Sequence, residues 1–254
     1  MLQKTLISFM LGMFIVSLSG CDDNKSVDNH AEHEVKTVTL DKRLVMVEVA
    51  GLINKRMPMA EVTQKYITPR FVDLNTGRLL KRSMVPENYN EQEAANDPKR
   101  SVVLNKQDDI AGIKRRENIG ELYLVNDDAG KLDKIIVPVR GEGKYALIYA
   151  FVSLNADDLS IYRFGIYKHS ETPGLGAKFV DDPDVVKRFT GKHVYKQGVS
   201  DFKVIMNHET SVDSNSIDGV SGATMTSDGI QNAINFWCGD NAFGPAIKKL
   251  RVKS

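Results

Sequence analysis

The sequence predicts an α+β domain with a mainly antiparallel sheet packed by helices, preceded by an N-terminal membrane anchor. Four segments in the middle of the chain are rich in β-branched and aromatic residues and are separated by stretches of turn composition. Segments with the apolar spacing of helices lie on both sides of them. The chain has 254 residues and 42% apolar content, enough for one core of about 200 residues.

The first 21 residues predict attachment to a membrane. An uncharged stretch at 5–20 follows Lys4. Its length lies between that of a signal-peptide core, about 7 to 15 residues, and that of a spanning helix, about 20. The stretch ends in Leu18-Ser19-Gly20-Cys21, which resembles a lipobox, so Cys21 is the predicted lipidation site. The alternative is a single uncleaved span with a chance cysteine.

Both kinds of anchor place the rest of the chain outside the cytoplasm, because Lys4 is the flank that stays inside. Asp22, directly after the cysteine, resembles the signal that keeps bacterial lipoproteins in the inner membrane. We therefore expect a protein of the bacterial inner membrane whose globular domain lies on the periplasmic side.

A polar tether is predicted at 22–40, because its first part has almost no large apolar residues. His30 and His33 have a spacing that could bind a metal, but nothing nearby supplies ordered partners for them. We therefore interpret them as part of a solvated linker and expect no metal site.

A single domain is predicted at 41–254. Its first expected elements are helices at 43–55 and 59–66, a strand at 71–74, a turn at 75–77 and a partly helical polar segment at 88–109. The second helix should end before Thr68-Pro69, because the residue before a proline disfavours helical geometry.

The middle of the domain predicts an antiparallel meander. The expected strands are at 119–125, 134–139, 145–154 and 159–167, with turns at 126–130, 141–143 and 155–158. Because the turns are short, consecutive strands should pair with one another.

The stretch at 218–227, D-G-V-S-G-A-T-M-T-S, comes before an amphipathic helix. The apolar residues after it recur at i, i+3, i+4 and i+7, so the helix should start near Thr226, capped by Thr226 or Ser227. Thr224 would then lie just ahead of a helix N-terminus, which favours a phosphate group. Gly222 and Ala223 leave the approach to its hydroxyl open.

This stretch resembles the signature of covalent FMN-binding domains, in which the threonine that closes S-G-A-T is esterified by the FMN phosphate. The resemblance implies covalent FMN on Thr224, with Asp218 and Ser221 as further motif positions beside Gly222 and Ala223. Thr226 is the nearest competing hydroxyl.

The stretch at 171–176, E-T-P-G-L-G, resembles the loop that lies along the flavin in the same family, which implies that Thr172, Gly174 and Leu175 contact the cofactor. Its composition agrees, because proline and glycine set a tight turn and glycine lets backbone approach a flat ring. Tyr145 stands where the family leads us to expect a tryptophan. An aromatic stacking role and a structural role are both open for it.

The stretches at 69–77, 235–237 and 243–245 resemble the C subunit of the sodium-translocating NADH:quinone reductase. The resemblance covers about 40–250 and implies an electron relay through the flavin. It also implies a dedicated flavin transferase, and partner subunits that oxidise NADH, reduce quinone and carry sodium.

The chain itself offers no complete site for NADH. Gly141-Glu142-Gly143 lacks the third glycine and the helix of a dinucleotide-binding motif. The redox chemistry is therefore expected from the flavin. Cys238, on the predicted helix, is expected to be buried and inert, because no second cysteine or cation cluster activates it.

Other classes of function are weighed against this expectation. The chain has 34 basic and 33 acidic residues, well interspersed, so a nucleic-acid partner is not expected. One alternative is the G subunit of the related ion-pumping ferredoxin:NAD complex, which shares the S-G-A-T motif. Another is a non-redox lipoprotein interaction module in which that motif is unmodified.

Overall fold

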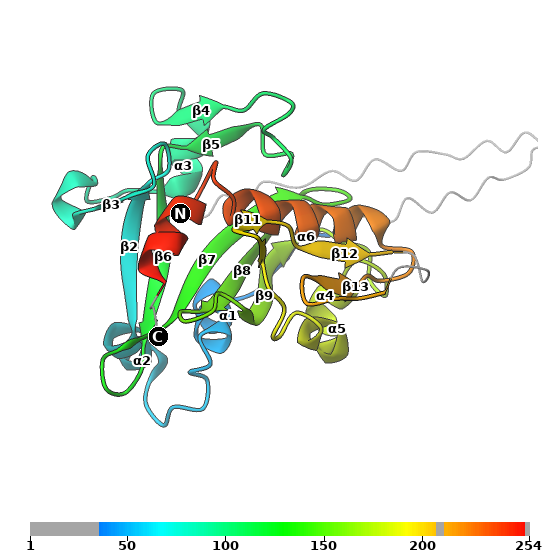
Figure 1. The fold of residues 1–254 in the computed structure, drawn as a ribbon, viewed down its shortest axis with the longest axis horizontal. Helices are drawn as coiled ribbons and strands as arrows, with labels where there is room; N and C mark the ends of the chain where they lie inside the picture. Colours follow the sequence, from blue (N-terminus) through cyan, green and yellow to red (C-terminus); the bar gives the residue numbers. More distant parts are fainter. Residues whose placement is uncertain (1–35, 207–210, 252–254) are drawn as a thin grey trace, which may run out of the picture. The chain divides into compact units, whose positions relative to one another are not determined.

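A seven-stranded antiparallel sheet, in the order β1-β9-β8-β7-β6-β2-β3, forms the centre of the domain (Figure 1). The computed structural model describes residues 36–206 and 211–251. The strands are β1 (Val38–Thr39), β2 (Ile67–Asp73), β3 (Arg78–Leu80), β6 (Ile119–Asn126), β7 (Leu132–Glu142), β8 (Leu147–Asn155) and β9 (Ile161–His169). Strands β6 to β9 are neighbours in chain order, which confirms the predicted meander.

The helices are α1 (Lys42–Val49), α2 (Met59–Tyr66), α3 (Glu91–Asn96), α4 (Lys178–Asp181), α5 (Pro183–Lys187), α6 (Thr224–Trp237) and α7 (Gly244–Leu250), with a 3-10 turn η1 (Arg82–Met84). Small two-stranded sheets pair β4 (Ser101–Val103) with β5 (Arg115–Glu117), β10 (Tyr195–Lys196) with β11 (Val199–Ser200), and β12 (Lys203–Ile205) with β13 (Ser216–Asp218). The pair β12–β13 is parallel.

The sheet has an apolar layer on each face because alternate strand residues point to opposite sides. On β7, Ile135 and Val137 pack in the core that α6 and α7 cover, whereas Ile136 packs in the core under α1 and α2. Trp237 secures α6 to this sheet, since its Nε1 donates to the carbonyl oxygen of Arg140 at 2.8 Å. Nearer the N-terminus of α6, Gly229 packs closely on the backbone of Glu142 at the end of β7, which holds this part of the helix beside the turn that joins β7 to β8.

Several expected boundaries differ from the structure, including those of β2, expected at 71–74, and β9, expected at 159–167. Helix α1 ends at Val49 rather than residue 55, because Gly51 adopts a left-handed φ of 74° that ends a helix. Strand β7 continues through Glu142, where we expected a turn, and the turn instead lies at 143–146, with Gly143 N–H bonded to Ala146 O at 2.9 Å. Tyr145 therefore belongs to this turn and not to β8. The end of α2 at Tyr66 agrees with the prediction.

No helix within the described ranges is long and apolar enough to cross a membrane. The predicted anchor at 1–21, the lipidation site Cys21, and His30 and His33 of the tether all lie outside the described residues.

Candidate functional site

A hollow of about 230 Å³ lies at the N-terminus of α6. Three segments far apart in sequence meet there, namely the β7–β8 turn, the loop at 171–176 and the start of α6. The lining residues are Lys144, Glu171, Thr172, Leu175, Gly176, Gly222, Ala223, Thr224, Met225 and Thr226.

The first turn of α6 contains Thr224 itself. The N–H of Ser227 donates to Ala223 O at 2.9 Å, so the helix begins at Thr224 and the expected start near Thr226 is wrong by two residues. Neither Thr226 nor Ser227 caps the helix, and the N-cap residue Ala223 makes no side-chain hydrogen bond. The first amides of the helix therefore have no intrahelical acceptor, and they add the positive end of the helix dipole to the hollow.

Glu171 connects the three segments that surround the hollow. Its side chain is buried, and its carboxylate accepts hydrogen bonds from the Thr226 hydroxyl and from the backbone N–H of Lys144 at 3.0 Å. The position of Gly176 is tight, because a Cβ there would collide with the Thr226 hydroxyl. The loop, the turn and α6 are thus joined through one buried carboxylate.

Replacing Thr226 by valine should destabilise the domain without preventing modification of Thr224. Valine keeps the shape but leaves one Glu171 oxygen without its donor, which costs about 1–3 kcal/mol. Urea unfolding would measure this loss, and Thr226→Ser, which restores the hydroxyl, is the matched control. Equal stability of the valine variant and the wild type would contradict the role given to this hydrogen bond.

Lys144 is the one cationic side chain among the residues that line the hollow. Its ammonium lies 4.9 Å from the centre of the Tyr145 ring and lowers the pKa of the Tyr145 hydroxyl. Glu171, the anionic side chain of the lining, is already engaged by its two donors. An anion in the hollow would therefore meet Lys144 and the amides of α6.

The structure brings five of the expected site residues into the lining, which are Thr172, Leu175, Gly222, Ala223 and Thr224. Thr224 is exposed, so its hydroxyl is accessible.

Four expected site residues lie near the hollow but are not part of its lining. Asp218 ends β13, and its carbonyl accepts from Arg188 at 3.0 Å. Ser221 is in the exposed turn before α6, Gly174 is at the tip of the 171–176 loop, and Tyr145 is 47% exposed beside Lys144.

Sequence reasoning missed Lys144 and the roles of Glu171 and Thr226. Glu171 is the first letter of E-T-P-G-L-G, and Lys144 directly follows Gly141-Glu142-Gly143, but neither position shows a spacing that links it to Thr224. Glu171 and Thr226 are 55 residues apart in the chain, so no local sequence pattern predicts the hydrogen bond between them.

Cys238 is buried, as expected, and takes no part in the hollow. Burial raises the pKa of its thiol to about 12, so the thiol stays protonated and unreactive at neutral pH.

The chemistry of the hollow fits a phosphorylated ligand. It offers an uncapped helix N-terminus, a cation and the Thr172 hydroxyl, which is buried and has no hydrogen-bond partner in the described part of the chain. Residues 143–239, which contain every residue that lines the hollow, match the family model of the FMN-binding domain.

Relatives extend the match to most of the chain. The C subunit of the Na(+)-translocating NADH-quinone reductase of Yersinia pestis is 39% identical over 216 residues, which cover 84% of this chain and 80% of the relative. The chain belongs to the family of C subunits of Na(+)-translocating NADH-quinone reductases. The C subunit of the Vibrio alginolyticus reductase is 37% identical over 213 residues, which cover 84% of this chain and 82% of the relative.

The fold agrees with the family. The crystal structure of Shewanella oneidensis NqrC matches with a TM-score of 0.72 at 32% identity, covering 82% of this chain and 94% of that one. These relatives are C subunits, which favours this family over the G subunit alternative.

Proposed function

We propose that the chain is the electron-carrying C subunit of a sodium-translocating NADH:quinone reductase and holds FMN covalently through a phosphoester to Thr224. The observation that carries the proposal is the accessible Thr224 hydroxyl at an uncapped helix N-terminus beside Lys144, inside the FMN-binding domain. When bound, FMN supplies electron transfer, while the protein supplies binding, orientation and a local field.

Different residues of the hollow would bind the phosphate and the flat ring of FMN. The first amides of α6 and the Lys144 ammonium face the negative charge of a phosphodiester. Thr172 offers a buried hydroxyl to the ligand. Leu175 and Met225, which are 37% and 57% exposed, supply apolar surface against which a flat ring can pack.

The proposal extends to the setting of the domain. We place it on the periplasmic side of a bacterial inner membrane, held by the N-terminal anchor, with a flavin transferase that attaches the cofactor. Partner subunits oxidise NADH, reduce quinone and move sodium. The relatives belong to sodium-translocating NADH-quinone reductases, which supports this assignment.

Intact-mass measurement of the chain produced together with its transferase tests the proposal. The wild type should carry one FMN and Thr224→Ala none. FMN on the alanine variant would contradict attachment at Thr224. A wild-type chain without any flavin would favour the non-redox interaction module.

Reversing the charge of Lys144 should slow flavin attachment. In Lys144→Glu the acidic group repels the incoming phosphate at the hollow, and we expect the initial rate of attachment to fall about tenfold, an effect of about 1.4 kcal/mol. The rate is followed by intact mass over time. Lys131→Glu, an exposed change just before β7 and so at the end of that strand opposite to Lys144, should leave it unchanged, and an equal rate in both variants would contradict the role of Lys144.

A further inference from the structure

The loop at 171–176 leaves the main sheet from a buried base. His169, the last residue of β9, is 3% exposed, and Ser170 and Glu171 after it are 4% and 5% exposed. The Ser170 hydroxyl lies 2.9 Å from the hydroxyl of Thr37, just before β1. The base of the loop is therefore held against the sheet, whereas the tip of the loop is exposed.

The ring of His169 holds the first residue of this loop. The backbone N–H of Glu171 donates a hydrogen bond to His169 Nδ1 at 3.1 Å. Because Nδ1 accepts, the proton of the neutral ring is on Nε2, which is buried and has no hydrogen-bond partner in the described part of the chain. The hydrogen bond from Glu171 therefore exists only while the ring is neutral.

Glu171 passes this constraint on to the hollow. Its carboxylate accepts from the Thr226 hydroxyl and from the backbone N–H of Lys144. The carboxylate has little room to move, because a Cβ at Gly143 or Gly176 would collide with one of its oxygens. A shift of the Glu171 backbone would therefore change how the loop and the β7–β8 turn meet the start of α6.

Two carboxylates act on the imidazole of His169, and burial outweighs both of them. Asp181 of α4 and Glu171 raise its pKa, but the loss of solvent lowers it by more, so that the pKa falls below its ordinary value of 6.5. The ring is therefore neutral at pH 7, as the hydrogen bond from Glu171 requires.

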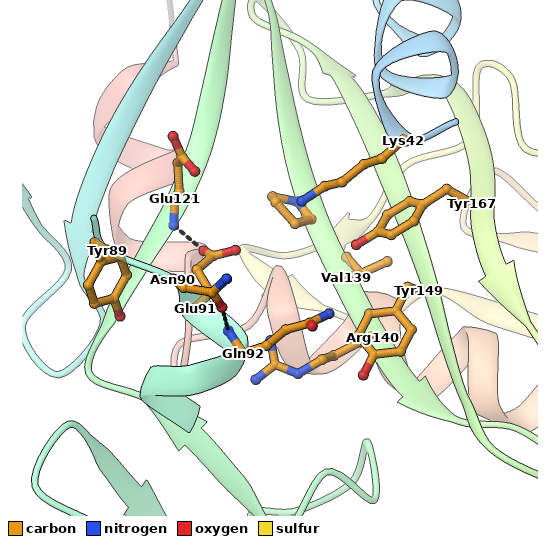
Figure 2. A pocket seen from close by; sticks show the side chains of 11 residues that line it. Lys42, Tyr89, Asn90, Glu91, Gln92, Glu121, Val139, Arg140, Tyr149 and Tyr167 are labelled. Atoms are coloured by element: carbon orange, nitrogen blue, oxygen red, sulfur yellow. Dashed lines mark hydrogen bonds between the residues drawn. The ribbon is translucent and has the colours of Figure 1, made fainter. Parts of the chain in front are cut away.

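Lys168, the neighbour of His169 in β9, is directed to the opposite face of the sheet. Its ammonium lies 5.4 Å from the centre of the Tyr149 ring, which lines a cavity of about 330 Å³ on the side that α1 covers (Figure 2). Successive strand residues point to opposite faces, so His169 lies on the side of α4. The other charged side chains of the segments around the ring are exposed, namely Lys36, Lys144 and Lys178.

We propose that His169 is a positioning residue for flavin attachment, and that a second proton on its ring releases the loop. The new Nδ1–H would face the N–H of Glu171, so that two donors meet and the hydrogen bond is lost. The charged ring would also compete with Thr226 and Lys144 for the Glu171 carboxylate. The inference rests on the proposed attachment of FMN at Thr224 and adds a dependence on pH to that site.

The direction of the pH effect follows from the neutral ring. Because folding lowers the pKa of His169, the loop is fully held above pH 6.5 and is released as the pH falls through the lower pKa of the folded state.

NMR titration of the full-length chain in detergent, produced without its transferase, tests the release of the loop. The neutral His169 ring should carry its proton on Nε2. On acidification, the amide signals of the loop should shift with the same midpoint as the ring. His169→Asn is the matched variant, because an asparagine oxygen accepts from the N–H two residues ahead in an Asx turn and does not titrate. In this variant the acid shift of the loop should be absent.

The rate of flavin attachment, followed by intact mass over time, is the second readout. His169→Asn should match the wild type at pH 8. The rate of the wild type relative to this variant should fall about twofold at the midpoint of the ring, where half of the rings are neutral. His169→Gln, whose longer side chain places its oxygen elsewhere, should be about two- to tenfold slower at every pH, as expected for one lost hydrogen bond. The same transferase acts on all three chains, so its own pH dependence cancels in these ratios.

Loop signals that do not follow the ring would overturn the inference, as would unfolding of the whole chain before the ring titrates. An asparagine variant as slow as the glutamine variant at pH 8 would overturn it too. If His169→Gln does not fold, the comparison of the wild type with His169→Asn decides alone. Flavin on the wild type with a ratio independent of pH would refute this inference and leave the proposed function intact. A wild type without flavin at any pH would refute the proposed function, and the NMR titration would still decide whether His169 holds the loop.

Discussion

Thr224→Ala should abolish NADH-driven quinone reduction in the assembled complex. If the flavin is attached as we propose, the variant lacks the attachment atom, and the relay through this protein is lost. The chain should fold normally, because Thr224 is exposed and its hydroxyl makes no hydrogen bond within the described residues. Steady-state quinone reduction and the melting temperature of the isolated chain would be measured together.

Thr224→Ser is the matched control, since it retains a hydroxyl at the same position. It should keep part of the flavin and a corresponding part of the rate. Quinone reduction at the wild-type rate in a complex with the alanine variant would show that electrons do not pass through a flavin on Thr224.

Glu117→Ala should cost about 3–5 kcal/mol of the free energy of unfolding, because it leaves a buried guanidinium without its partner. The Glu117 side chain is 1% exposed and that of Arg140 14%. The Arg140 guanidinium also lies 4.4 Å from the Trp237 ring, so its displacement would disturb the packing of α6 on β7. Urea unfolding measures the loss.

The exposed ion pair of Arg163 and Glu48, with 3.3 Å between Nη1 and Oε1, provides the comparison. Glu48→Ala should cost about 1 kcal/mol or less, because solvent already stabilises both charges. Similar losses in the two variants would contradict the claim that the Glu117–Arg140 pair is a structural element of the sheet.

The sequence predicts those strands and helices whose ends are set by residues close to them in the chain. Strands β6 to β9 follow from β-branched composition and polar turns, and α2 ends before Thr68-Pro69 because of the proline. The start of α6 is predicted two residues too late. Threonine is a residue type that often caps helices, but the Thr226 hydroxyl donates its hydrogen bond to Glu171 of the 171–176 loop instead. The pairing of β6 with β7 ends at Tyr123 and Ile136, although both strands continue, and no local pattern in the sequence marks this point.

The site also has residues that the sequence identifies and residues that only the folded arrangement brings together. The motif around Thr224 and the loop at 171–176 are recognisable through their resemblance to a family, and the structure brings both to one hollow. The role of Lys144 and the Glu171–Thr226 hydrogen bond cannot be recognised in the sequence, because they arise only when the β7–β8 turn and the loop at 171–176 meet α6.

The most direct test of the central claim is fragmentation mass spectrometry of the peptide that carries the flavin. Trypsin cleaves after Lys203 and Lys248, so the peptide at 204–248 contains Ser221, Thr224, Thr226 and Ser227 together. The account predicts the FMN phosphate on fragments that include Thr224 and not on those that begin at Met225. An adduct located on Thr226 or on either serine would contradict it.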